Sequence, residues 1–224
     1  MQIEPIAYIE TDFKEKFGIP RQSGRAPTLG RIVFLPKYRD REALRGIEAF
    51  SHLWLLFDFS LAHREGFSPT VRPPRLGGNT RVGVFATRSP YRPNSIGLSS
   101  VKLIRVDKNE LDGDYLVVEG ADLLDKTPIY DIKPYIPHSD CHPDAVGSYA
   151  DLHQDHALSV KDPDDRLSLM PEDKRIAAIA CLKEDPRPSY QNDPERIYRM
   201  RFADFEIAFR VDGIDLTIIE VTEC

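Results

Sequence analysis

Five arginines lie close together in residues 71–98, and this stretch holds no aspartate, glutamate or lysine. They are Arg72, Arg75, Arg81, Arg88 and Arg92. Like charges at such short spacing repel one another unless carboxylates or phosphates approach them. One interpretation is a solvated face that pairs with acids from elsewhere in the fold. The other is an anion site, in which guanidinium groups and exposed backbone N–H groups bind phosphate or a cofactor carboxylate.

Prolines and glycines shape the backbone around these arginines, because proline fixes φ and glycine permits positive φ. They are Pro73, Pro74, Pro90, Pro93, Gly77, Gly78, Gly83 and Gly97. Only Arg81–Ala86 alternates as a strand does. The stretch therefore predicts two stiff, arginine-bearing loops joined by a short strand.

Four segments taken together resemble a known family. The longest is PRLGGNTRVGVFATRSPYRPNSIGLS at residues 74–99, and the others are PRQ at 20–22, DIKPY at 131–135 and DPRP at 185–188. In this order they span most of the chain and resemble the TsaA-like family, the tRNA methyltransferases of the TrmO type. The resemblance implies an S-adenosylmethionine-dependent enzyme that methylates the exocyclic amine of threonylcarbamoyl-adenosine at tRNA position 37, beside the anticodon. It also implies a β-barrel methyltransferase domain, tRNA as partner, and a homodimer with cofactor sites near its interface.

The resemblance further implies which residues contact S-adenosylmethionine. They are Pro20, Arg21, Gln22, Ser60, Leu61, Arg88, Leu98, Gly120, Ala121 and Asp122. At Ser60 and Leu61 the chain departs from a histidine-containing pattern of some members. From the residues alone, Arg21 is a surface arginine, and Asp122 with Asp125 is either a turn and cap pair or an acid/base pair.

Asp131 and Lys133 share one face of a strand expected over residues 129–135. Such a pair is usually a structural ion pair, and the resemblance of DIKPY gives a role at the substrate or cofactor equal weight. Methyl transfer chiefly requires alignment of the amine with the methyl sulfonium, and Asp131 is a candidate acceptor for the departing proton. The residues expected at the tRNA are Arg72, Arg75, Arg92, Arg187 and Tyr190. For Arg187 the alternative is a turn that only stops a helix.

The charge distribution agrees with a polyanionic partner, although the net charge of the 224 residues is −6. Residues 138–173 hold nine acidic and two basic side chains, whereas residues 19–105 hold fifteen basic and five acidic ones. A basic body with an acidic insertion is typical of a surface that binds a polyanion.

No apolar run reaches the length of a membrane span, and no secretory signal is visible. Three widely spaced cysteines indicate a reduced, cytoplasmic chain.

Short strands joined by shaped loops predict a mainly β or α+β fold, and no Gly-x-Gly-x-x-Gly follows a strand, which argues against a Rossmann fold. We expect a β-barrel domain over 1–137, a mobile acidic insertion over 138–170 and a small α+β domain over 171–224. The expected strands are Ile3–Ile9 at an edge, Ile32–Leu35, a buried Ser51–Ser60, Arg81–Ala86, Ile96–Val106, Tyr115–Ala121, Ile129–Tyr135, Met200–Val211 and Ile214–Val221. The expected helices are Pro36–Phe50 and Pro171–Glu184. Trp54 and His52 are expected in the core.

Two other functions remain open. One is an RNA- or nucleotide-binding module of the same fold without chemistry, which would not bind S-adenosylmethionine. The other is a metal-dependent hydrolase that uses a histidine and cysteine cluster of zinc-ligand types. Its members are His138, Cys141, His142, His153 and His156. The cluster lacks a Cys-x-x-Cys pair, so we expect no metal.

Overall fold

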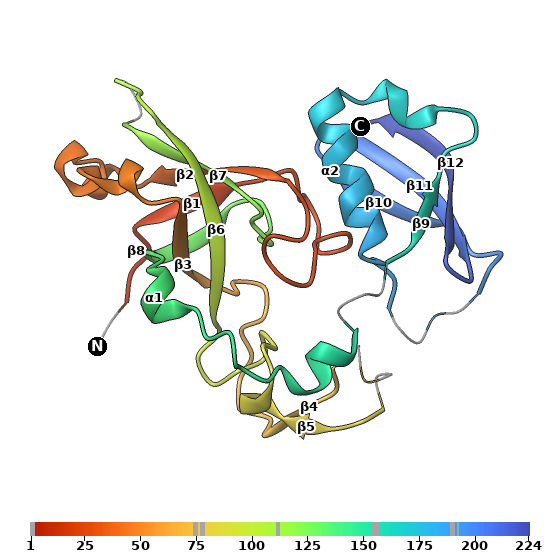
Figure 1. The fold of residues 1–224 in the computed structure, drawn as a ribbon, viewed down its shortest axis with the longest axis horizontal. Helices are drawn as coiled ribbons and strands as arrows, with labels where there is room; N and C mark the ends of the chain where they lie inside the picture. The colour runs from red at the N-terminus through yellow and green to blue at the C-terminus, as the bar shows by residue number, and fades with distance from the viewer. Residues whose placement is uncertain are drawn as a thin grey trace.

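The computed structural model describes residues 3–73, 76, 79–110, 113–153, 157–188, 191 and 193–224, and it forms a barrel beside a smaller sheet (Figure 1). The barrel is closed and antiparallel, in the order β1-β2-β7-β6-β3-β8. Its strands are β1 (Ala7–Glu10), β2 (Leu29–Phe34), β3 (His52–Asp58), β6 (Ile96–Asp107), β7 (Tyr115–Glu119) and β8 (Thr127–Pro134). The predicted β-barrel class is confirmed.

Alternating side chains separate the inside of the barrel from its outside. In β3, Leu53, Leu55 and Phe57 are buried inside, while the residues between them face outward. This period of two is the pattern of a strand with one buried face. Gly97 of β6 lies against the Phe57 ring so closely that a Cβ at residue 97 would be 2.2 Å from it. Glycine is therefore required where β6 begins.

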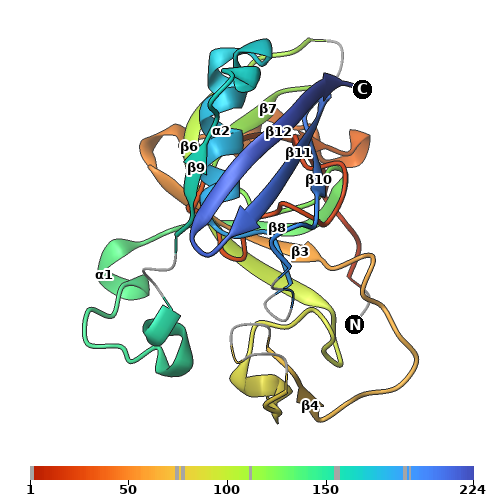
Figure 2. The same cartoon turned by 90° about the vertical axis from the view of Figure 1, so that its right-hand side faces the viewer.

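Three loops leave the barrel at one end, which we call the loop end. They are residues 11–28 between β1 and β2, residues 59–95 between β3 and β6, and residues 120–126 between β7 and β8. The strand register places them together, because Leu29 is opposite Glu119, Asp58 is opposite Ile96, and Ile9 is opposite Thr127. Within the longest loop, β4 (Thr70–Val71) pairs with β5 (Val82–Gly83), and a 3₁₀ helix follows at Val84–Ala86. This arm projects from the barrel in Figures 1 and 2.

The smaller sheet has the order β10-β11-β12-β9 and is covered by one helix. Its elements are β9 (Ser159–Lys161), α2 (Glu172–Lys183), β10 (Tyr198–Phe202), β11 (Phe205–Asp212) and β12 (Asp215–Glu223). Helix α2 buries Ala177, Ala178, Cys181 and Leu182 against the sheet. The helix predicted at Pro171–Glu184 is therefore confirmed, with Pro171 just before its first residue.

The first loop joins the two cores. Phe13 is 1% exposed and packs edge-on against Phe202, and Phe17 stacks on Tyr198 and Phe209. Gly18 has φ +93°, and a Cβ there would lie 2.4 Å from the sulfur of Met200. The loop that carries Pro20, Arg21 and Gln22 is therefore held between the barrel and the smaller sheet.

The helix expected at Pro36–Phe50 is wrong. The structure has short 3₁₀ helices at Pro36–Tyr38, Arg41–Leu44 and Ile47–Ala49. Asp40 accepts a hydrogen bond from the Glu42 backbone N–H, which begins a new turn. That turn ends at Leu44, and Gly46, in a left-handed conformation, begins the next one. Local capping therefore divides a segment whose apolar spacing looks helical.

Three strand expectations also need correction. The first strand begins at Ala7, and it is no edge, because it pairs with both β2 and β8. The strand expected over Arg81–Ala86 is shorter than predicted, because residues 84–86 form a 3₁₀ turn. The strand expected over Met200–Val211 is divided into β10 and β11 by a tight turn, in which Ala203 has φ +53°. Its phenylalanines Phe202, Phe205 and Phe209 are buried as expected.

Trp54 and His52 are not in the core. His52 is exposed, and Trp54 lies on the outside of β3, where its Nε1 donates to the Asp140 carboxylate at 2.9 Å. Asp140 belongs to the short helix α1 (Pro137–Asp140). Both residues occupy the outward positions of an alternating strand, which the run of apolar residues concealed.

Part of the acidic segment belongs to the smaller domain. Leu158, Leu167 and Met170 are buried in its core, and β9 pairs in parallel with β12. Further 3₁₀ helices occupy Ser148–His153 and Arg166–Leu169. The expectation of a mobile insertion over 138–170 is therefore wrong for residues 158–170. Their apolar side chains are spaced among acidic ones, so the acidic composition hid the buried positions. In the described residues, no helix has the length and apolarity needed to cross a membrane.

Candidate functional site

Arg88 and Gln22 meet at the loop end. The Nη1 atom of Arg88 donates to the Oε1 atom of Gln22 at 2.7 Å, across 66 positions of sequence. Arg88 remains exposed beside this contact, so its guanidinium is available to an anion. Two residues expected from separate motifs therefore lie side by side, on the first and second loops.

Gly120 brings the third loop against the first. Gly24 donates its backbone N–H to the Gly120 carbonyl at 2.8 Å, and Gly120 donates to Thr28 at 2.9 Å. Gly120 has φ +84°, and a Cβ there would lie 3.0 Å from the Gly24 Cα atom. This close approach fixes the loop of Gln22 beside Gly120, Ala121 and Asp122.

Asp122 supplies a partly buried carboxylate to the same region. The hydroxyl of Ser99, which was not among the expected residues, donates to Asp122 Oδ1 at 2.6 Å. Burial raises the pKa of Asp122, while the Ser99 hydrogen bond and the charge of Arg88 act in the opposite direction. The loop end thus combines a cation, an amide and an acceptor, which suits a small polar ligand with a carboxylate and hydroxyls.

We expect Asp122→Asn to raise the thermal midpoint at neutral pH. The folded pKa lies above the ordinary 3.8 of aspartate, so the ionised carboxylate disfavours folding. That penalty is absent in acid and complete above the folded pKa. Melting curves at several pH values check this: the advantage of the variant should shrink as the pH falls. A midpoint difference that is constant with pH would contradict it.

Leu61 and Leu98 present apolar surface near the loop end. Leu61 is 62% exposed and Leu98 is 53% exposed. Leu98 lies on the outer face of the barrel, opposite Leu56 of β3, whereas Ser60 and Leu61 directly follow β3. Exposed aliphatic side chains at this position suit the apolar parts of a small ligand.

Asp131 and Lys133 also lie on the outer face. Asp131 is opposite Leu56, so Leu98, Leu56 and Asp131 form one row across β6, β3 and β8. Asp131 Oδ2 accepts from the Lys133 ammonium at 2.7 Å, and Oδ1 accepts from the Ile132 backbone N–H at 2.9 Å. Both oxygens therefore have partners within the strand.

The arginines of residues 71–98 have different environments. Arg72 is exposed. Arg92 points inward to its own loop, where its Nη1 atom donates to the Thr87 carbonyl at 2.7 Å. Arg75 and Tyr190 lie outside the described residues. Arg92 therefore shapes the loop that presents Arg88.

Arg187 is buried, with 7% of its surface exposed. Its Nε and Nη2 atoms donate to the two oxygens of Asp185 at 2.8 and 3.0 Å, and Asp185 raises the pKa of Arg187. The Arg187 carbonyl accepts from Nη2 of Arg21 at 3.1 Å. The DPRP turn is thus joined to the PRQ loop, and in this conformation the Arg187 guanidinium has little surface for RNA.

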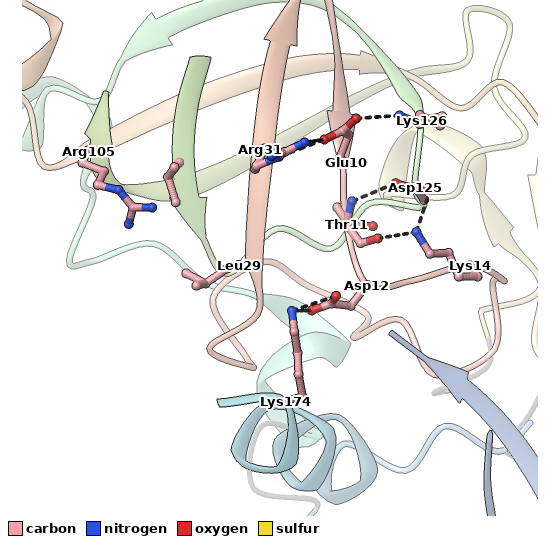
Figure 3. Close-up of a pocket in the computed structure, with 11 residues that line it drawn as sticks. Glu10, Thr11, Asp12, Lys14, Leu29, Arg31, Arg105, Asp125, Lys126 and Lys174 are labelled. Carbon is pink, nitrogen blue, oxygen red and sulfur yellow. Dashed lines mark hydrogen bonds and ion pairs between the residues drawn. The ribbon is translucent and has the colours of Figure 1, made fainter. Parts of the chain in front are cut away.

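A cavity of about 410 Å³ lies elsewhere, between the outside of β1 and β2 and helix α2 (Figure 3). Its lining residues are Glu10, Thr11, Asp12, Lys14, Leu29, Arg31, Arg105, Val117, Asp125, Lys126 and Lys174. The cations pair with acids, as in Lys174 with Asp12 at 2.7 Å and Lys14 with Asp125 at 3.0 Å. None of these described lining residues is an expected cofactor contact. We therefore interpret the ion pairs around the cavity as a network that holds the first loop against α2.

A closed antiparallel barrel of this kind is a non-Rossmann domain, and its loop end presents a cation, an amide and a carboxylate. Comparison with known proteins gives the family. Residues 8–141 match the tRNA-methyltransferase O N-terminal domain, and residues 171–224 match the TrmO C-terminal domain. The chain belongs to the TrmO family.

Similar proteins agree over nearly the whole chain. A "tRNA (adenine(37)-N6)-methyltransferase" of Escherichia coli is 42% identical, over 94% of this chain and 93% of that protein. A "putative S-adenosylmethionine-dependent methyltransferase RcsF" of Pseudomonas aeruginosa is 40% identical, over 96% of this chain and 94% of that protein. The crystal structure of TrmO from Pseudomonas aeruginosa matches with a TM-score of 0.81 and 34% identity, over 100% of this chain and 97% of that one. The predicted family is confirmed.

Proposed function

We propose that this chain transfers a methyl group from S-adenosylmethionine to the exocyclic amine of adenine 37 in tRNA. The finer proposal is that the adenine carries a threonylcarbamoyl group. The support is the family, the names of its relatives and the meeting of three separate loops at the loop end. When bound, the cofactor supplies a methyl group on a positively charged sulfur.

The side chains at the loop end suit S-adenosylmethionine. The exposed guanidinium of Arg88, fixed by Gln22, is a partner for a carboxylate. The carboxylate of Asp122, oriented by Ser99, accepts hydrogen bonds from hydroxyls or an amine. The positive φ of Gly120 lets backbone approach closely where a side chain would stand. The proposed contacts are Pro20, Arg21, Gln22, Ser60, Leu61, Arg88, Leu98, Gly120, Ala121 and Asp122.

These residues act mainly by positioning. An adenine amine and a methyl donor held at a fixed distance react without losing further translational freedom. This lowers the activation barrier by several kcal/mol. The double connection of the first loop, to Gly120 and to the smaller sheet, keeps that geometry rigid. Asp131 and Lys133 remain candidates for a direct role.

We propose that the arm that contains β4 and β5 is the principal contact for the tRNA, with Arg72 and Arg75 at the phosphates. Arg92, Arg187 and Tyr190 stay in the proposed set. The contacts of Arg92 and Arg187 favour a role in shaping the surface that binds RNA.

Residues 1–137 and 158–224 form the two proposed domains, and residues 138–157 the acidic connection between them. We propose a cytoplasmic location, since the three cysteines are free.

We propose a homodimer that uses the arm. Phe67 and Phe85 are 53% and 75% exposed, and their rings stack with centroids 6.1 Å apart. Exposed aromatic pairs of this kind mark contact surfaces. We expect Phe85→Ser to convert the protein to a monomer in light scattering, while Phe50→Ser, at a 39% exposed residue outside the arm, leaves the dimer intact. Equal masses for both variants would contradict this interface.

Calorimetric titration with S-adenosylmethionine tests the proposed function. Micromolar binding, about −8 kcal/mol, supports it, and methyl transfer to tRNA is then assayed with labelled cofactor. Folded protein that shows no binding would instead indicate an RNA-binding module.

In the described residues, no group of three metal-ligating side chains comes together. Methylation that survives a chelator would argue against the metal-dependent hydrolase.

A further inference from the structure

Asp58 and His63 form a close pair at the end of β3. The Nε2 atom of His63 lies 2.6 Å from Oδ1 of Asp58. The Asp58 side chain is 13% exposed, whereas the His63 side chain is 61% exposed. A sheltered carboxylate therefore holds an imidazole whose other edge is open to a substrate.

The carboxylate determines which ring nitrogen carries the hydrogen. A carboxylate oxygen accepts hydrogen bonds, so the ring nitrogen that faces it, Nε2, is the one expected to donate. Nδ1 then keeps its lone pair, and no described residue makes a hydrogen bond to it. This is the arrangement of a general base, in which the carboxylate also stabilises the imidazolium that forms.

The pair lies beside the proposed cofactor contacts. His63 follows Leu61 by two residues, and Asp58 is opposite Ile96 on the outer face, next to the row of Leu98, Leu56 and Asp131. On the other side, Asp58 faces the hydroxyl of Tyr130 in β8. Burial and the charge of Asp58 raise the pKa of Tyr130.

The other charged groups nearby have different partners. Asp131 has both oxygens engaged, by Lys133 and by the Ile132 backbone. The guanidinium of Arg64 lies 3.9 Å from the centre of the Tyr91 ring, and the Lys16 ammonium donates to the Leu61 carbonyl at 3.3 Å. Glu65 is exposed in the same turn. His63 is therefore a better placed proton acceptor than Asp131.

We propose that His63, oriented by Asp58, accepts the proton that leaves the substrate amine during methyl transfer. The inference rests on the proposed function. As the N6–CH₃ bond forms, the bond between methyl and sulfur breaks and its electron pair stays on sulfur in S-adenosylhomocysteine. The N6–H bond also breaks, its electron pair stays on nitrogen, and the proton goes to Nδ1 of His63.

A base matters more for a carbamoylated amine than for a free one. The carbonyl draws the nitrogen lone pair into conjugation, so the nitrogen attacks weakly while it keeps its hydrogen. Removing the proton as the new bond forms restores nucleophilicity, and positioned bases contribute about 10²–10⁴ in rate.

The test compares His63→Gln and Asp58→Asn with His142→Gln, which changes an exposed histidine outside this pair. Single-turnover methylation of tRNA that bears threonylcarbamoyl-adenosine should slow about 100-fold in His63→Gln, with the dissociation constants of cofactor and tRNA unchanged. Asp58→Asn should slow it as well, and His142→Gln should not. Added imidazole should restore part of the rate to His63→Gly. Nitrogen NMR of the cofactor-free protein should show His63 protonated on Nε2, and Asp58→Asn should remove this preference.

Different results separate this inference from the proposed function. If the wild-type protein binds and methylates and His63→Gln does so equally fast, only the role of His63 is overturned. A loss of rate matched by a loss of cofactor affinity, or hydrogen on Nδ1 in the NMR spectrum, would also overturn it. A folded wild-type protein that does not bind S-adenosylmethionine overturns both.

Discussion

Arg187→Ala should lower the free energy of unfolding by about 3 kcal/mol, because removing one partner of a buried ion pair is strongly destabilising. Arg187 is 7% exposed and binds both oxygens of Asp185. The same change should weaken cofactor binding several-fold, about 1 kcal/mol. Without its side-chain bonds to Asp185, residue 187 no longer holds the turn whose backbone carbonyl accepts from Arg21 at 3.1 Å. Chemical denaturation and calorimetric titration measure the two effects.

Arg25→Ala is the matched control. Arg25 pairs with Glu184 at 3.0 Å, near the same turn, but its side chain is 39% exposed. Exposed pairs contribute less than about 1 kcal/mol. Arg187→Lys keeps the charge and loses the bidentate geometry, so it should be intermediate. An Arg187→Ala protein with unchanged stability and a loss confined to tRNA affinity would establish a direct RNA contact and refute the supporting role.

Arg88→Ala should weaken S-adenosylmethionine binding about 30- to 100-fold, because a charge-assisted hydrogen bond contributes about 2–3 kcal/mol. The side chain is exposed and contacts Gln22 at 2.7 Å, so its loss should change the thermal midpoint little. The dissociation constant of the cofactor, measured by calorimetry, checks the first expectation, and a melting curve checks the second.

Arg81→Ala provides a comparison on the same stretch of chain. Arg81 is also exposed, and it donates to the Thr70 hydroxyl at 2.9 Å within the arm. It should leave cofactor affinity unchanged, although it removes the same charge. If both variants weaken binding equally, the effect does not depend on a direct contact of Arg88 with the cofactor, and the assignment of Arg88 as a contact is wrong.

Several elements could be predicted from local pattern alone. An apolar run marked β3, alternation marked β6, and helix α2 followed from its proline and its acidic first turn. The failures occurred where a short local interaction competed with that pattern. The cap at Asp40 and the left-handed Gly46 divided an apparent helix, and Ala203 turned the chain between two strands. Such turns depend on single backbone conformations, which hydrophobic periodicity does not report.

The site shows a similar division. Motif resemblance named Gln22, Arg88 and Asp122, but their meeting depends on the order of six strands around a closed barrel. Ser99 was missed because strand alternation gives no reason to single out a buried hydroxyl. The pair of Asp58 and His63 was missed because a turn separates the two residues, and a carboxylate five positions before a histidine is a weak signal.

By itself the sequence determined the family and the basic character of residues 19–105, because these depend on residue type and local spacing. Only the tertiary structure decided that Arg187 is buried, that Trp54 faces outward and that three loops share one end of the barrel. The reason is that burial and proximity are set by strand register and closure. These arise from contacts between residues far apart in the chain, and local sequence carries little record of them.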